Sequence, residues 1–245
     1  LVNGDRRGVY GSTGFNDPLF DNPQGTAIVG DTIYVADAGI HTIVEIDLDE
    51  GVAGTLAGTG EQSLYRHTGG NALRVPLNSP YDLSLYEDTL YIAMAGFHQL
   101  WTMNLDERTV TTFAGDGVED IVDGMKPEAR LAQPYGIEVS NNTVFFIDSE
   151  TSSVRVAAIA EEGRVVTLVG TGLFDFGDHD GVGKKALLQH PQGLAVRNDA
   201  IYVADSYNNK IKSIAIGSLQ ARTIAGSGEN GYQDGTLAEA TFNEP

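Results

Sequence analysis

The sequence predicts an all-β protein of the β-propeller class, and three observations carry this prediction. A proline recurs at the same place in a repeated pattern, at intervals of 57, 54, 57 and 54 residues. Each of the first four prolines precedes two short β-rich runs joined by a two-residue turn, and each of these repeats closes on a Thr-x-(Ala/Val)-Gly signature. Four-stranded repeats with glycine-rich punctuation are typical of propeller blades, which must stack on neighbours to bury both faces. The prolines are Pro23, Pro80, Pro134, Pro191 and Pro245.

The first two strands of each repeat are predicted to form a hairpin. In the first repeat the runs 26–29 and 32–37 flank the turn Gly30-Asp31. Tight hairpin turns need positive φ angles, which Gly, Asn and Asp tolerate. Glu87 therefore fits its turn least well. The corresponding turns are Glu87-Asp88, Asn141-Asn142 and Asn198-Asp199.

A third and a fourth strand complete the predicted repeat. Polar and apolar residues roughly alternate in the third run, as in a strand with one wetter face. A polar turn such as 49–51 leads into the fourth run, so each repeat is predicted to be a four-stranded antiparallel meander. The nearest candidate for a short helical turn is 184–188. The third runs are 42–47, 99–104, 153–157 and 210–214, and the signatures end at Gly58, Gly115, Gly170 and Gly226.

The whole chain, residues 1–245, is predicted to be one propeller segment with a partial blade at each end. At roughly 55 residues per repeat it holds about four and a half blades, whereas propellers close with four to eight. We therefore expect at least one further blade outside this sequence. A four-bladed ring closed by the two end pieces is the alternative. The predicted blades start near Pro23, Pro80, Pro134 and Pro191.

Composition and charge exclude several classes of function. The net charge is −19, from 34 acidic and 15 basic residues, so the surface repels phosphate backbones and argues against nucleic-acid binding. The absence of cysteine excludes a disulfide framework, a thiol nucleophile and a cysteine metal site within this sequence. No apolar run reaches the ~20 residues of a membrane span. The acidity is compatible with a basic partner, with solubility in salt, or with no specific partner.

The repeats resemble the NHL-repeat family of β-propellers. The fourth repeat carries most of the family pattern, in Pro191, Gly193, 202–206 and 208–211. The segments 91–101, 176–183 and 240–245 are similar to those NHL proteins that combine the propeller with a thioredoxin-like domain. The resemblance implies a six-bladed parent propeller, a cytoplasmic location, and a redox domain that lies outside these residues.

Loop lengths predict which end of the blades binds a partner. Because antiparallel strands alternate direction, the links between blades and the links from second to third strands fall at one end. These long links, 59–79, 116–133, 171–190 and 227–244, are where recognition is expected on a rigid scaffold. The predicted partner-binding residues at this end are Asp116, Glu119, Asp120, Asp123, Asp175, Asp178, Asp180, Glu229, Asp234, His41 and His98.

Three sets of recurring polar residues each allow a structural and a functional interpretation, and the structural one is favoured each time. Asp-Gly pairs, 11 residues before three of the prolines, predict turns, and the alternative is a calcium loop over 175–180. The aspartates that end the second strands are predicted to accept backbone N–H bonds of the following turn, rather than to line a channel. His41 and His98 are interpreted as structural, with a shared metal or an acid–base pair as the alternative. The aspartates are Asp37, Asp148 and Asp205.

These observations favour a non-catalytic binding scaffold without cofactors. The expected partner is a protein, a peptide or the accompanying thioredoxin-like domain. No serine-nucleophile motif, phosphate loop or zinc signature is present in the sequence. A metal-dependent hydrolase or lyase with its site at the channel mouth is the alternative, so enzymatic activity stays open. Trp101 is predicted to pack between blades.

Overall fold

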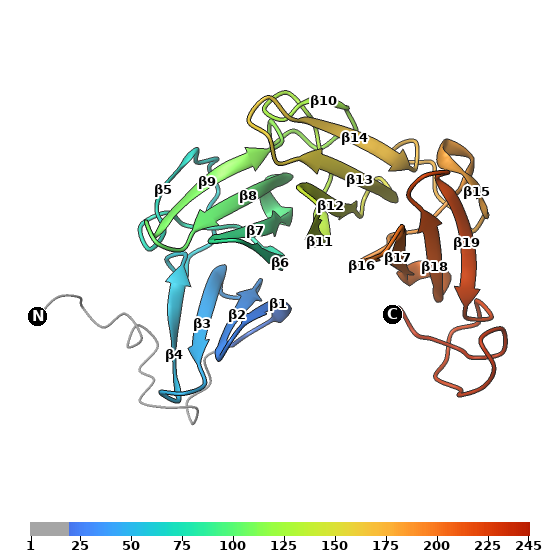
Figure 1. Ribbon diagram of the computed structural model, residues 1–245, viewed down its shortest axis with the longest axis horizontal. Helices are drawn as coiled ribbons and strands as arrows, with labels where there is room; N and C mark the ends of the chain where they lie inside the picture. The colour runs from blue at the N-terminus through green and yellow to red at the C-terminus, as the bar shows by residue number, and fades with distance from the viewer. Residues whose placement is uncertain (1–19) are drawn as a thin grey trace, which may run out of the picture. The chain divides into compact units, whose positions relative to one another are not determined.

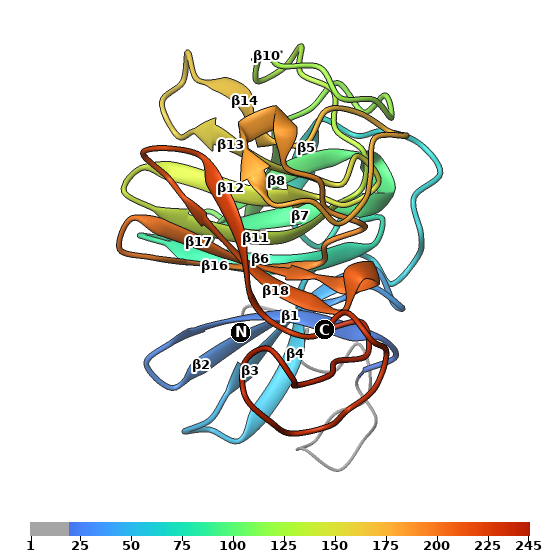
Figure 2. The same cartoon turned by 90° about the vertical axis from the view of Figure 1, so that its right-hand side faces the viewer.

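The computed structural model describes residues 20–245 and divides the chain into two compact units, residues 1–113 and 114–245. Each unit contains two antiparallel sheets whose main strands follow one another in chain order (Figures 1 and 2). The four sheets are blades 1 and 2 in unit 1, and blades 3 and 4 in unit 2. The all-β propeller fold predicted from the repeats is therefore confirmed. No helix among the described residues is long and apolar enough to cross a membrane.

The described part of unit 1, from residue 20 on, contains nine strands and one short 3-10 turn. Strand β6 of blade 2 contacts β1 and β2 of blade 1, so the first strands of the two blades lie side by side. Blade 1 consists of β1 (Pro23–Val29), β2 (Thr32–Asp37), β3 (Thr42–Asp47) and β4 (Val52–Ala57). Blade 2 consists of β5 (Gly69–Asn71), β6 (Pro80–Tyr86), β7 (Thr89–Met94), η2 (Ala95–Phe97), β8 (Gln99–Asn104) and β9 (Thr109–Ala114).

Unit 2 repeats the arrangement, with β11 of blade 3 against β16 of blade 4. Blade 3 consists of β10 (Gly124–Met125), β11 (Pro134–Ser140), β12 (Thr143–Asp148), β13 (Ser153–Ala158) and β14 (Arg164–Val169). Blade 4 consists of β15 (Gly181–Val182), η3 (Gly183–Lys185), β16 (Gly193–Arg197), β17 (Ala200–Asp205), η4 (Ser206–Asn208), β18 (Lys210–Ala215) and β19 (Gln220–Ala225). The predicted helical turn near 184–188 corresponds to η3, whereas η2 and η4 were not predicted.

A fifth strand on the outer edge of three blades departs from the predicted four-stranded meander. The strands β5, β10 and β15 come from the long link that precedes each blade, and each pairs antiparallel with that blade's last strand. Two of them begin at an Asp-Gly pair, so the turn predicted at Asp123-Gly124 and Asp180-Gly181 is wrong. These segments were not recognised because two or three residues carry no strand periodicity. Their effect is to tie each long link to the blade that follows it.

The two-residue hairpin turns adopt the backbone conformation that their sequences predict. The first turn residue has a positive φ in every blade, namely Gly30 (54°), Glu87 (52°), Asn141 (48°) and Asn198 (53°). Three of these four residues are Gly or Asn, which tolerate this region, whereas a residue with a long side chain is disfavoured there. Glu87 is thus the one strained position of the four.

Glycine after the blade proline permits the first strands of neighbouring blades to approach. A Cβ added to Gly136 would lie 2.8 Å from the carbonyl oxygen of Gln192 and 3.1 Å from the nitrogen of Leu194. A Cβ added to Gly25 would lie 2.5 Å from the Cα of Asp82. All three distances are to backbone atoms, which cannot move aside easily, so any side chain at these positions would separate the blades.

Each unit buries a separate core between its two blades. In unit 1, fully buried Trp101 joins side chains of both blades, among them Ile43 and Leu56 of blade 1. Its ring stacks on Phe97 at 5.6 Å, and its Nε1–H donates to Gln99 at 3.0 Å. Trp101 therefore packs between blades, as the sequence predicts. In unit 2 the core contains Phe145, Ile147, Val154, Val169, Ile201, Val203 and Ile214.

We expect Glu87→Gly to stabilise unit 1 by about 0.5–1 kcal/mol, because it removes the left-handed strain of a residue with a Cβ. Glu87→Asn should give part of this gain. Chemical denaturation followed by the fluorescence of Trp101 measures the change. Asn198→Gly in blade 4 is the matched control, followed by hydrogen exchange because the single tryptophan lies in unit 1, and little change is expected since Asn already tolerates the conformation. A destabilised Glu87→Gly variant would contradict the assignment of strain.

Candidate functional site

The long links of unit 2 contain most of the predicted partner-binding acids, and the structure gives several of them a cationic partner within the unit. Asp116 and Asp120 both pair with Arg130, at 3.1 and 3.4 Å. These pairs are solvent-exposed, so each contributes little to stability. Asp175 accepts a hydrogen bond from the hydroxyl of Thr171 at 2.9 Å. Glu119, Glu229 and Asp234 lie exposed.

Asp123 is part of a buried network centred on Arg155, whose side chain is fully buried. One guanidinium nitrogen of Arg155, Nη1, lies 2.7 Å from the carboxylate of Asp148. The other, Nη2, lies 3.0 Å from the carboxylate of Asp123 and 3.1 Å from the carbonyl oxygen of Val122. Asp123 also accepts the backbone N–H of Thr167 at 3.0 Å and its hydroxyl at 2.7 Å. One cation thus joins the long link to the third strand and to the end of the second.

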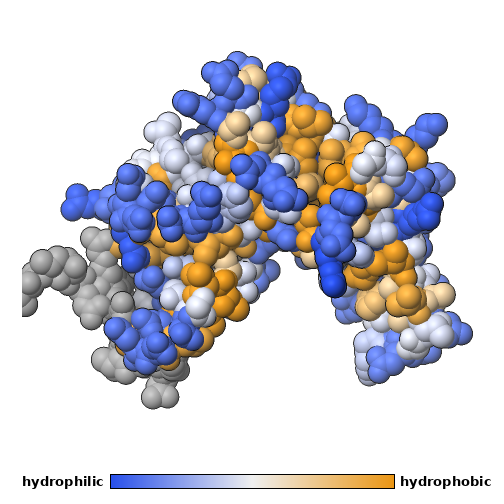
Figure 3. All heavy atoms as spheres, in the orientation of Figure 1, coloured by the Kyte–Doolittle hydropathy of each residue, from blue (hydrophilic) through white to orange (hydrophobic). Residues whose placement is uncertain are grey.

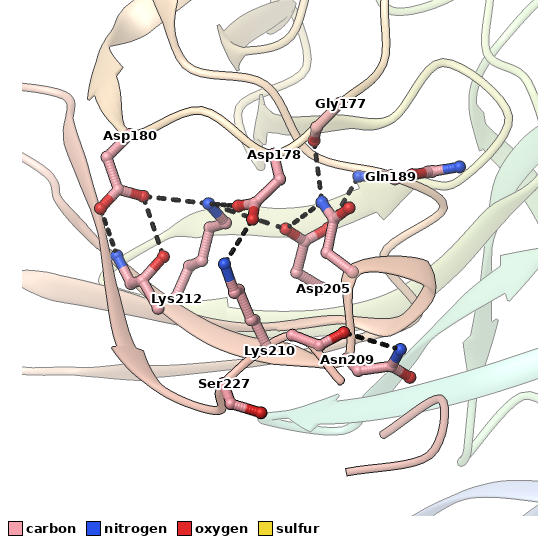
Figure 4. A network of polar contacts seen from close by, with 12 residues as sticks. Gly177, Asp178, Asp180, Gln189, Asp205, Asn209, Lys210, Lys212 and Ser227 are labelled. Carbon is pink, nitrogen blue, oxygen red and sulfur yellow. Dashed lines mark hydrogen bonds and ion pairs between the residues drawn. The ribbon is translucent and has the colours of Figure 1, made fainter. Parts of the chain in front are cut away.

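Blade 4 repeats this arrangement with a lysine (Figure 4). The Nζ atom of Lys212 lies 2.7 Å from Asp178, 2.9 Å from Asp180 and 3.9 Å from Asp205. Asp180 accepts the backbone N–H of Thr223 at 2.9 Å and its hydroxyl at 3.0 Å. Lys210 forms a further ion pair with Asp178.

We call this repeated arrangement the cation clasp. It consists of a buried cation at the third position of the third strand (Arg155 or Lys212), an acid of the long link (Asp123 or Asp180) and an acid that ends the second strand (Asp148 or Asp205). Blade 2 has apolar or small residues at all three positions, Trp101, Gly69 and Met94. Blade 2 therefore replaces the whole polar set by apolar or small residues, whereas blade 1 keeps the acid Asp37 at the end of its second strand and has buried Val44 in place of the cation.

Sequence reasoning identified the acids of the clasp but missed its cations. Arg155 and Lys212 look like residues of a solvated strand face, because each lies in a run that alternates polar and apolar side chains. The available signal was the correlation between repeats: both aspartates are absent from blade 2, where Trp101 takes the place of the cation.

The clasps perturb the pKa values of their members. Burial alone would raise the pKa of Asp123 and of Asp180, but the donors of Thr167 and Arg155, and of Thr223 and Lys212, lower both below the ordinary value. Burial likewise opposes a charge on Lys212, yet its hydrogen bonds to Asp178 and Asp180 raise its pKa.

Asp205 behaves in the opposite way, because burial raises its pKa to about 6. The amide of Asn208 at 2.8 Å and the N–H of Gln189 at 2.7 Å offset only part of that cost. The neutral form of Asp205 is therefore favoured in the folded state. Its contribution to the free energy of unfolding is complete below the unfolded pKa near 4 and is lost as the pH rises through about 6.

The carboxylates proposed as calcium ligands face an ammonium group of the protein itself. Asp178 and Asp180 both direct oxygens at Lys212, as Figure 4 shows. The ammonium group of Lys212 therefore already lies between the two carboxylates, where a calcium ion would have to bind. Among residues 20–245, no group of three or more His, Cys, Asp or Glu side chains is arranged to hold a metal ion.

His41 occupies a position that joins blade 1 to blade 2. Within unit 1, Nδ1 of His41 accepts the backbone N–H of Ser79 at 3.0 Å, just before Pro80. His98 has the same left-handed conformation, with a φ of 54° against 53° for His41. In unit 2 the equivalent residues act similarly: Ser152 Oγ accepts the N–H of His190 at 3.1 Å, and Asn209 Oδ1 accepts that of Glu244 at 3.0 Å.

The aspartates that end the second strands hold the entrance to their own blade. Asp148 accepts the N–H of Ala132 at 2.7 Å, and Asp205 accepts that of Gln189, so in both cases the donor lies in the preceding link. The prediction had placed the donors in the following turn. The carboxylate of Asp37 has donors on both sides. It accepts the backbone N–H groups of Asp21 and Asn22 before the blade, and those of Gly39 and Ile40 in the following turn.

Exposed aromatic side chains gather at the long-link end of the blades. Phe174 is 89% exposed, Tyr65 is 79% exposed and Tyr232 is 96% exposed, all within long links. Phe176 and Tyr207 expose about half of their surface, and Tyr207 lies in η4 beside these links. Figure 3 shows hydrophobic side chains among hydrophilic ones on the face that it presents. Aromatic residues at a surface are characteristic of protein interfaces.

Comparison with known sequences supports the repeat assignment. The NHL repeat profile matches residues 188–212. The chain is 38% identical to human NHL repeat-containing protein 2 over 94% of its own length and 36% of that protein. It is 37% identical to the Arabidopsis thaliana Protein SUPPRESSOR OF QUENCHING 1, chloroplastic, over 94% of its own length and 23% of that protein. The chain thus spans about a third or less of these relatives.

Solved structures share the fold at much lower sequence identity. An auxiliary nutrient binding protein from Bacteroides ovatus superposes with a TM-score of 0.61 at 14% identity, over 92% of this chain and 63% of that chain. A streptogramin B lyase superposes with a TM-score of 0.54 at 12% identity, over 89% of this chain and 57% of that chain. At such identities the likeness concerns the fold alone.

We expect Arg155→Met to destabilise unit 2 by about 3–5 kcal/mol, because it leaves Asp148 buried without its cation. Hydrogen exchange resolved along the chain measures the loss, since the single tryptophan lies in unit 1. Arg164→Met removes an exposed arginine of β14 and should change stability by less than about 0.5 kcal/mol. Equal effects of the two variants would contradict the cation clasp.

We expect His41 to make unit 1 sensitive to mild acid. Burial lowers the pKa of His41, although Asp37 acts to raise it. The contribution of His41 is therefore complete above its unfolded pKa of about 6.5 and is lost as the pH falls below that value, through the lower pKa of the folded state. His41→Asn should flatten the dependence of Tm on pH in this window, since Asn209 makes the same contact in blade 4. His41→Leu should cost about 1 kcal/mol at neutral pH. An unchanged pH profile in His41→Asn would contradict this role.

Proposed function

Because this chain is an NHL-repeat β-propeller, we propose that it is a binding scaffold whose long links meet a protein or peptide partner. The observation that carries the proposal is the distribution of exposed aromatic side chains. Of the described aromatic residues, those that expose about half or more of their surface all lie in the long links or in η4. Loops on a rigid frame are where binding residues concentrate.

The cation clasps support this proposal because they hold the links in place through bonds to buried cations and leave the outer surface of the links available to a partner. Each clasp holds its link from the buried side, through a carboxylate bonded to a fully buried cation. An ordered link loses less conformational entropy on binding than a free one. The links therefore offer apolar contact area in a defined arrangement.

Candidate partners include a thioredoxin-like domain of the same protein, which the NHL resemblance implies, and a separate protein. The net charge of −19 argues against nucleic acid as the partner. Since the chain covers only part of its relatives, the activity and partners of the whole protein are proposals as well.

Site-specific photo-crosslinking tests the proposal. A photoreactive residue at Tyr65 or Tyr232 should capture the partner, whereas the same residue at Asn142 or Asn198, in the hairpin turns of the other end, should not. An intramolecular product would identify an accompanying domain, and an intermolecular product a separate protein. Equal capture from both ends, or capture from the hairpin turns alone, would reject the proposal.

A further inference from the structure

Aromatic and acidic side chains from three segments of unit 2 converge on His190, the residue before the proline of blade 4. The imidazole of His190 stacks on the ring of Tyr207, with centroids 4.7 Å apart and an interplanar angle of 26°. The ring of Phe176 lies 6.3 Å away on the long link. Nε2 of His190 lies 3.5 Å from the carboxylate of Glu150 in blade 3. We call these four residues the aromatic patch.

The repeat explains how this patch arises. Glu150 and Tyr207 occupy the same position, the second residue after the acid that ends the second strand. The residues at this position in unit 1 are Gly39 and Gly96. A Cβ there would lie 2.6 Å from a carboxylate oxygen of Asp21 at Gly39 and 2.1 Å from the side-chain oxygen of Asn78 at Gly96. Only unit 2 therefore carries side chains at this position.

The exposed surface of the patch is apolar, planar and flanked by negative charge. Phe176 is 48% exposed, and Tyr207 keeps half of its surface open despite its stacking on His190. Glu150 adds a carboxylate, and its side chain is 37% exposed. Nδ1 of His190 has no hydrogen-bond partner among the described residues. Aromatic faces beside carboxylates attract cations that are planar or weakly hydrated, above all the guanidinium of arginine.

We propose that the aromatic patch binds a basic segment of a partner protein, with an arginine side chain stacked on the rings of Tyr207 and Phe176 and paired with Glu150. The assignment deepens the proposed function and rests on it, because it names the chemistry of the partner at the same end of the blades. Charge complementarity supports this occupant, since the chain has a net charge of −19. A phosphate-bearing or acidic partner would be repelled by the same carboxylates.

Binding of a short fluorescent peptide, in which arginine alternates with glycine and serine, to the full chain tests this assignment. Tyr207→Ala and Phe176→Ala should each weaken binding by roughly 3- to 30-fold, the range of a cation–π contact. Tyr207→Phe should retain binding, because the ring is kept. Replacing arginine by the neutral isostere citrulline in the peptide should abolish the difference between Tyr207→Ala and the parent protein.

Two matched controls separate a specific site from attraction to an acidic surface. Glu150→Gln removes a charge within the patch, and Glu50→Gln removes one charge from an exposed turn of blade 1. Glu150→Gln should weaken binding several-fold more than Glu50→Gln. Equal losses, or parent-like binding by Tyr207→Ala with an unchanged Tm, would overturn the assignment. If crosslinking from Tyr65 and Tyr232 still captured a partner in that case, the proposed scaffold function would be kept, and only the proposal that the partner binds through a basic segment would be rejected.

Discussion

The structure of unit 2 depends on one electrostatic constraint: a cation that is fully buried must find anions. Arg155 and Lys212 are withdrawn from water on the third strand of their blades, and the low polarity there makes an unpaired charge too costly to keep. Their carboxylate partners come from the end of the second strand and from the long link. Because the link must deliver its aspartate to the cation, its path follows from this pairing, whereas the short outer strand also forms in blade 2 without a cation.

Blade 2 shows that the same positions can be filled without charge. Met94, Phe97 and Trp101 take the places of Asp205, Asn208 and Lys212, and Phe97 stacks on Trp101 where Asn208 bonds to Asp205 in blade 4. Replacing a buried ion pair as a whole by well-packed apolar residues is often neutral or favourable, whereas removing one member is costly. The two sets are therefore alternative solutions in blades 2, 3 and 4. Blade 1 combines an acid with an apolar residue, because Asp37 accepts four backbone N–H bonds and buried Val44 stands at the position of the cation.

The repeat period and the turn residues were sufficient to predict the fold, because both are local. Gly30 and Asn141 need no tertiary partner to favour a hairpin, and the blade prolines mark the unit. The outer strands β5, β10 and β15 could not be predicted, since they exist only by pairing with a strand about 40 residues further along the chain. The aromatic patch was missed for the same reason. Glu150, His190 and Tyr207 are unremarkable in the sequence and gain meaning only where two blades bring them together.

Whether a blade has the apolar or the charged set of buried residues also affects which aromatic side chains lie at its surface. In blade 2 the aromatic rings of Phe97 and Trp101 lie inside, and the small Gly96 closes the position beside them against Asn78. In blade 4 a polar core holds the link, so Tyr207 and Phe176 remain outside. In unit 2 the bonds between the buried cation and the carboxylate of the link keep the link in register, while its outer residues are free to vary. Divergence of the repeats at the surface is thus possible because the buried cation, and not the exposed rings, holds the link in place.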